Sequence, residues 1–324
     1  MKRVALFLLS IMLMLPTRPS EAETKIRAVA TIPDLADMAR HIGGDLVEVT
    51  SIATGVEDIH AVPMKPSFAV LLNRADVLFL LGLEAEHAFL PGLLEAARNP
   101  KILRDAPGYI DCSVYITPLE VPIRIDRALG DQHPLGNPHF NLDPVLGKDA
   151  ARAIADGLSR NYPEYASTFK KNLDVYLAQL DAAIARWERE AAPLRGVKLV
   201  SYHPDLIYFA ERFGMETVGT IEIRAGVDPT PGHITDLEER MRKEKVDLVV
   251  RELHYPASLA ETIAQATGAK LVELPVMSGG RPETKDYISF IDYNLRTVLN
   301  AMQSGPKTAM EPASHQSGRQ QPGS

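Results

Sequence analysis

The strongest constraint on the fold is an alternation of buried strands and helices that occurs twice along the chain. The apolar runs of the first half are residues 26–32, 46–53 and 77–81. Those of the second half are residues 197–202, 217–223, 246–251 and 270–274. Strands that alternate with helices are typical of parallel sheets whose faces are covered by those helices. The sequence therefore predicts an α/β fold with two sheet-forming regions.

A long amphipathic helix is predicted between the two regions, over residues 163–192. Its apolar side chains recur every three or four residues: Phe169, Leu173, Tyr176, Leu177, Leu180, Ile184 and Trp187. The helix is too long for an ordinary crossover connection, so we expect a rigid rod that joins two similar α/β lobes. The predicted lobes are residues 24–162 and 193–302.

Two stretches lack regular patterns. Residues 109–144 are rich in proline, glycine and aspartate, and we expect them to be irregular. Residues 303–324 are rich in serine, glutamine, glycine and proline, so a disordered tail is predicted.

The N-terminus has the pattern of a secretory leader. Lys2 and Arg3 precede the apolar run Val4 to Leu15, and small residues at Ser20 and Ala22 follow. This pattern predicts a signal peptide over residues 1–22, too short to span a membrane as a mature helix. The single cysteine, Cys112, lies far from the leader and excludes an intramolecular disulfide, so we expect a free periplasmic protein that is not lipid-anchored.

The net charge argues against a polyanionic partner. The chain has 35 basic and 42 acidic side chains, and the predicted leader contains three of the former and one of the latter. The mature chain would carry 32 and 41, a net charge of −9, which disfavours nucleic acid and is compatible with cation handling.

Three of the nine histidines stand where strands or loops reach the sheet edges: His60, His139 and His203. Ligand-binding groups of α/β sheets collect at the carboxyl ends of parallel strands, so these side chains could converge. Three neutral imidazoles suit zinc, whereas calcium and magnesium prefer oxygen ligands. Spacing alone leaves a metal site and unrelated core or loop histidines both open, because no His-x-x-x-His or Cys-x-x-Cys pair fixes the geometry.

The segments around these histidines resemble the periplasmic zinc- and manganese-binding proteins of ABC importers, the TroA-like and ZnuA-like family. The resemblance covers about residues 25–302, and the Asn-Pro-His-x-x-Leu-Asp-Pro block at 137–144 is its most specific part. Its other segments are 57–60 with 65–67, 75–78, 201–204 with 208–209, 220–230, and 286–288 with 293–294.

The resemblance implies two α/β lobes joined by one long helix, with a metal in the cleft between them. It assigns His60, His139 and His203 as the first three ligands of a divalent transition metal, zinc before manganese or iron. It also implies delivery to an ABC transporter permease with its ATPase. A monomer is expected, and a periplasmic metallochaperone is a candidate further partner.

The chain departs from the family pattern at the fourth ligand. Members often supply an aspartate shortly after the last strand, but residues 272–276 contain none. Glu252 and Glu273 are the candidates here, with a helix cap or a salt bridge as the alternative role of each, and with water as an alternative fourth ligand. The histidine-rich acidic loop is also missing, because residues 115–138 carry only His133. His133 and Glu57 are candidate accessory groups.

Two other classes of protein compete with a metal-binding importer component. A zinc hydrolase would need a general base beside a metal-bound water, and no His-Glu-x-x-His motif supports one. A metal-stabilised adhesin would bind host matrix instead of serving a permease. The prediction is a binding protein that is not an enzyme. An imidazole-rich donor set without an assured carboxylate favours zinc over manganese or iron.

Overall fold

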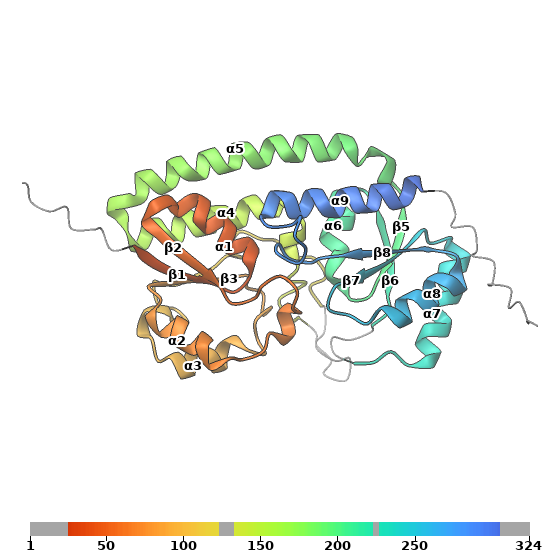
Figure 1. The fold of residues 1–324 in the computed structure, drawn as a ribbon, viewed down its shortest axis with the longest axis horizontal. Helices are drawn as coiled ribbons and strands as arrows, with labels where there is room; N and C mark the ends of the chain where they lie inside the picture. The colour runs from red at the N-terminus through yellow and green to blue at the C-terminus, as the bar shows by residue number, and fades with distance from the viewer. Residues whose placement is uncertain (1–24, 123–132, 223–226, 305–324) are drawn as a thin grey trace, which may run out of the picture.

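The computed structural model describes residues 25–122, 133–222 and 227–304. The expected leader and the expected tail from residue 305 onward lie outside the described residues. The chain forms two lobes that lie next to each other, and the long helix α5 (Ala166–Glu190) runs along both of them (Figure 1). No helix in these three ranges combines the length and apolarity needed to cross a bilayer.

The first lobe contains a parallel four-stranded sheet with the order β2-β1-β3-β4. Its strands are β1 (Ile26–Ala30), β2 (Val47–Ser51), β3 (Val77–Leu80) and β4 (Tyr109–Asp111). The connecting helices are α1 (Pro33–Gly43), α2 (Pro66–Arg74) and α3 (Leu90–Ala97). Ala28 of the central strand pairs with Val49 on one side and Val77 on the other. The carboxyl ends of the strands therefore meet at one edge.

The second lobe repeats this arrangement, with the order β6-β5-β7-β8 and all strands parallel. Its strands are β5 (Lys198–Ser201), β6 (Glu216–Thr220), β7 (Leu248–Glu252) and β8 (Lys270–Leu274). Its helices are α6 (Ile207–Arg212), α7 (Pro231–Glu244), α8 (Ala257–Thr267) and α9 (Tyr287–Gln303). In each lobe the first strand lies between the second and the third. The prediction of two similar lobes with central parallel sheets is confirmed.

Short 3₁₀ helices occupy several connections. They are Gly44–Leu46, Ile59–Ala61, Pro100–Ile102, Phe140–Leu142, Pro163–Tyr165, Ala192–Leu194 and Pro204–Leu206. Two of them flank α5, so the rod predicted over 163–192 is a 25-residue α-helix with a 3₁₀ turn at each end. At 1.5 Å per residue the α-helical part is about 37 Å long.

Helix α5 joins the lobes through an apolar face and through α9, which lies beside it (Figure 1). Phe169, Leu180 and Trp187 on α5 are fully buried. The Trp187 indole Nε1 donates a hydrogen bond of 3.0 Å to Asp292 on α9. The apolar contacts continue from the first sheet through α5 to α9 and one face of the second sheet, so one core spans both lobes. A second, smaller apolar cluster lies between the second sheet and helices α7 and α8.

Two elements differ from the sequence expectations. The segment 109–144, expected to be irregular, begins with the edge strand β4, which pairs with β3. Helix α4 (Pro144–Asn161) was not indicated by the sequence patterns at all. Its buried face consists mainly of alanine and glycine, so no run of large apolar residues marks it. Close packing requires this face, because a Cβ on Gly147 would lie 2.3 Å from the Tyr287 hydroxyl.

Helix α1 of the first lobe also holds the segment that follows β8. Asp34 is fully buried and accepts a hydrogen bond from the backbone N–H of Ser278, at 3.3 Å. Asp37 accepts one from the backbone N–H of Tyr287 at 3.1 Å. Gly55, at φ +104°, permits a close approach, since a Cβ there would lie 2.1 Å from the Ser278 carbonyl oxygen. These contacts fix the two lobes against each other beneath α5.

The buried Asp34 carboxyl predicts a pH-dependent stability. Burial raises the pKa of Asp34 to about 8, so the folded protein holds a proton there that the unfolded chain releases near pH 3.8. The contribution of this group to stability therefore falls as pH rises between these values, by about 1.4 kcal/mol per pH unit. We expect Asp34→Asn to flatten the decline in urea midpoint between pH 5 and pH 8. The exposed Asp174→Asn is the control, and an unchanged slope in Asp34→Asn would contradict the prediction.

Candidate metal centre

Four imidazoles lie together between the lobes. Their ligand nitrogen atoms, from His60, His133, His139 and His203, are all within 4.8 Å of one another. We call these four side chains the histidine cluster. The structure thus brings together the three histidines that the sequence singled out as ligands and the candidate accessory residue His133.

Local structure places each of the three predicted ligands. His60 lies in the 3₁₀ turn after β2, where its backbone N–H donates to the capping carboxylate of Asp58 at 2.8 Å. His203 lies two residues after Ser201, the last residue of β5. The backbone N–H of His139 donates to the Asn137 side chain at 3.0 Å. Two of the three predicted ligands therefore lie in segments that follow the carboxyl end of a strand: His60 after β2 and His203 after β5.

The Asn-Pro-His block is tied to the second lobe on both sides of His139. Before it, the Asn137 amide donates to the Pro204 carbonyl at 2.8 Å. After it, Asp143 accepts two hydrogen bonds from the Arg212 guanidinium, at 2.7 and 2.8 Å. These contacts hold the segment that carries His139 against the second lobe, and so place the His139 imidazole between the lobes.

The ring nitrogens at the centre of the cluster face one another or lack hydrogen-bond partners. Nε2 of His60 lies 3.2 Å from Nε2 of His139. Nε2 of His133 and of His203 is buried and has no hydrogen-bond partner within the described part of the chain. Buried polar atoms are almost always paired, so several unpaired ring nitrogens that face one point fit a cation.

Contacts at the opposite ring nitrogens orient two of the imidazoles. Nδ1 of His60 lies 3.1 Å from the Ala85 carbonyl oxygen, and Nδ1 of His203 lies 3.1 Å from a Glu222 carboxylate oxygen. The Tyr255 hydroxyl donates to the same Glu222 oxygen at 2.8 Å. Because an acceptor at Nδ1 holds the proton there, the Nε2 lone pair is left for a metal.

Asp205 is the carboxylate that lies against the Nε2 atoms of the cluster. Its Oδ1 lies 2.9 Å from Nε2 of His139 and 3.5 Å from Nε2 of His203. The sequence analysis missed this residue, because it sought a fourth ligand after the last strand. The signal was its position two residues after His203, at the carboxyl end of β5.

The candidate carboxylates from the sequence lie elsewhere. Glu273 forms ion pairs with Arg251 and Arg281. Glu252 is fully buried at the end of β7, where burial and the nearby charge of Asp205 raise its pKa well above the usual range. Glu57 accepts hydrogen bonds from the backbone and hydroxyl of Thr54 and so closes its own turn. In the described residues we found no contact of Glu57 or Glu273 with the cluster, whereas the Glu252 carboxylate lies near Asp205 and the backbone N–H groups of Tyr202 and His203.

The electrostatics keep two of the four imidazoles, His60 and His133, neutral. Burial and the neighbouring imidazoles lower the pKa of His60 well below 6.5, and burial and His139 lower the pKa of His133 to about 3. Burial also lowers the pKa of His203, but Asp205 and Glu222 outweigh it and raise the value. For Asp205 burial is outweighed by His139 and His203, so its pKa is lowered and it stays ionised. Neutral nitrogens with one carboxylate form a donor set for a divalent cation.

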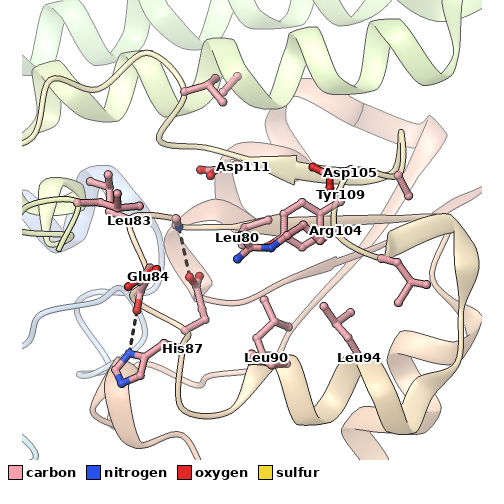
Figure 2. A pocket seen from close by; sticks show the side chains of 18 of the residues that line it. Leu80, Leu83, Glu84, His87, Leu90, Leu94, Arg104, Asp105, Tyr109 and Asp111 are labelled. Atoms are coloured by element: carbon pink, nitrogen blue, oxygen red, sulfur yellow. Dashed lines mark hydrogen bonds between the residues drawn. The ribbon is translucent and has the colours of Figure 1, made fainter. Parts of the chain in front are cut away.

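A cavity of about 1080 Å³ lies beside the cluster in the first lobe (Figure 2). His133 belongs to both the cavity lining and the histidine cluster. Leu80, Leu90 and Leu94 line the cavity together with the carboxylates of Glu84 and Asp111 (Figure 2). The metal centre is thus bordered on one side by open space rather than by packed core.

The sequence matches a known family over most of its length. The family model described as zinc-uptake complex component A, periplasmic, matches residues 28–301. The chain belongs to this ZnuA family. The ZnuA family consists of solute-binding proteins of metal uptake systems rather than enzymes.

Individual relatives differ in the metal that they are named for. The zinc-binding lipoprotein AdcA of Streptococcus pneumoniae serotype 4 is 24% identical over 96% of this chain, which spans 63% of AdcA. The iron-binding protein YfeA of Yersinia pestis is 25% identical over 86% of this chain and 87% of YfeA. A crystal structure of a zinc-bound ZnuA deletion mutant is 26% identical, with a TM-score of 0.72 over 87% of this chain and all of that one. The matches therefore establish the family and the two-lobed fold, and the metals named for the relatives differ from one relative to another.

Proposed function

We propose that the protein captures one divalent transition-metal ion, zinc in preference, and presents it to the permease and ATPase of an ABC importer. The observation that carries the proposal is the convergence of the four ring nitrogens of the histidine cluster. His60, His139 and His203 would hold the ion, and Asp205 would be the fourth ligand in place of Glu252 or Glu273. His133 would be an accessory ligand on the cavity side.

The donor set supports zinc over manganese or iron. Zinc accepts imidazole nitrogens in a tetrahedral site, whereas manganese prefers more oxygen donors. In the described residues Asp205 is the carboxylate that lies against the Nε2 atoms of the cluster, whereas Glu222 contacts His203 at the opposite ring nitrogen. A single oxygen donor leaves the set rich in nitrogen.

Zinc binding is directly measurable on the purified protein. After removal of bound metal with a chelator, isothermal titration is expected to show one zinc ion bound per chain, more tightly than manganese or ferrous iron. The physical reason is the nitrogen-rich donor set. Tighter binding of manganese would reverse the metal assignment, and the absence of saturable binding by all three ions would reject the proposal.

The remaining parts of the proposal concern where and with what the protein acts. The expected leader supports action in the periplasm, as a free monomer, and a metallochaperone is a candidate donor of the metal. AdcA is named a lipoprotein, whereas the one cysteine of this chain, Cys112, is buried within the first lobe. We propose that the protein performs no covalent chemistry, because its family consists of solute-binding proteins and the sequence has no His-Glu-x-x-His motif that would supply a general base.

A further inference from the structure

An unusual turn at the carboxyl end of β3 supplies the carbonyl that orients His60. Gly82, Leu83 and Glu84 all have positive φ, at 90°, 52° and 64°. Side chains rarely adopt this backbone conformation, and two of the three residues are not glycine. The next residue, Ala85, presents its carbonyl oxygen to Nδ1 of His60 at 3.1 Å. We call residues 82–87 the β3 turn.

The buried carboxylate of Glu86 holds this turn together. Its Oε1 accepts hydrogen bonds of 2.6 Å from the Thr31 hydroxyl and from the backbone N–H of Leu81. Its Oε2 accepts a longer one, of 3.3 Å, from the backbone N–H of Gly82. Thr31 follows β1, whereas Leu81 and Gly82 follow β3, so one carboxylate links the turn to the ends of two neighbouring strands.

The β3 turn needs hydrogen-bond acceptors at this buried position. Glu86 is 3% exposed and lies in the lining of the cavity, where burial raises its pKa to about 7. An apolar side chain here would leave the Thr31 hydroxyl and the backbone N–H groups of Leu81 and Gly82 without an acceptor. Three donors converge on Glu86 and fix the backbone immediately before Ala85, and this backbone determines where the Ala85 carbonyl points.

We infer that Glu86 is a positioning residue of the metal centre, which acts through the β3 turn to hold the His60 imidazole in the metal-binding tautomer. The inference rests on the proposed function, because it assigns His60 to the metal. Glu86 itself touches no residue of the histidine cluster in any contact that we observe. Outer contacts of this kind commonly change metal affinity by about 10- to 100-fold.

The test compares Glu86→Gln with Glu95→Gln, a matched change of an exposed cavity residue. Glutamine keeps the size but replaces one acceptor oxygen with an NH₂ group, which cannot accept from Gly82. We expect zinc affinity, measured by competition with a chelator, to fall at least about tenfold in Glu86→Gln and to be unchanged in Glu95→Gln. Imidazole ¹⁵N spectra of the metal-free variant should show that His60 no longer populates a single Nδ1–H tautomer.

The two readouts separate the outcomes. A wild-type zinc affinity and an unchanged His60 spectrum in Glu86→Gln would overturn the inference, as would a lowered unfolding midpoint with neither change. Failure of the wild-type protein to bind zinc would reject the proposed function, while the spectrum of the metal-free protein would still test the effect of Glu86 on His60. If Glu86→Gln does not fold, Thr31→Val provides the same test, since it removes one donor. It should lower zinc affinity, and an unchanged affinity would overturn the inference.

Discussion

His139→Ala is expected to weaken zinc binding by more than about 100-fold, the upper end of what outer contacts to a metal site are worth. The His139 ring lies at the middle of the site, because its Nε2 is 3.2 Å from His60 Nε2 and 2.9 Å from Asp205 Oδ1. Alanine removes the proposed ligand and also the ring that lies between His60 and Asp205. Chelator competition on metal-stripped protein measures the loss.

The matched control for this prediction is His41→Ala. His41 is a surface histidine on α1, whose side chain is 48% exposed and pairs with Asp37 at 3.7 Å. Its loss should leave zinc affinity at the wild-type value. Equal affinities of wild type and His139→Ala, with an unchanged circular dichroism spectrum, would defeat the assignment of His139 as a ligand.

Asp205→Asn is expected to weaken zinc binding by about 100-fold and manganese binding by more. The substitution keeps the shape of the side chain but removes the charge that faces His139 and His203. Manganese should lose more because it depends more on charged oxygen donors. Titration of both ions into wild type and variant gives the two ratios.

Glu273→Gln distinguishes Asp205 from the carboxylate that the sequence suggested. Glu273 forms ion pairs with Arg251 and Arg281, so the substitution should weaken these two ion pairs and leave metal affinity unchanged. A greater loss of zinc affinity in Glu273→Gln than in Asp205→Asn would show that the fourth ligand had been placed wrongly.

The sequence predicted the elements that are marked by periodic large apolar side chains or bounded by glycine and proline. The alternation of apolar runs was sufficient for both parallel sheets, and the spacing of residues such as Phe169 and Trp187 was sufficient for α5. Helix α4 was not predicted, because its buried face consists mainly of alanine and glycine, which leave little periodicity in the hydrophobicity of the sequence. Strand β4 escaped because it has three residues and lies at a sheet edge.

At the metal centre, the histidines were identifiable because imidazoles at strand ends are few and chemically distinct. Carboxylates are common, and only the folded structure shows which one faces inward. Asp205 is buried against two histidines, whereas Glu273 is paired with Arg251 on the neighbouring strand and with Arg281 after β8, yet both carboxylates follow or lie in a strand. The distinction depends on how β5 and β8 are placed relative to the other lobe, which local sequence does not encode.

The division of the ligands between the two sides of α5 has a mechanical consequence. His139 precedes this helix and His203 follows it, so a metal held by both would close a loop in the chain as a covalent cross-link does. A chain with one cysteine has no internal disulfide for that purpose. The bound metal would then act as a reversible cross-link that restricts the unfolded chain. It would raise resistance to heat and proteases only while it is bound. The metal-bound and metal-free forms of the protein would therefore survive for different times before they unfold or are degraded.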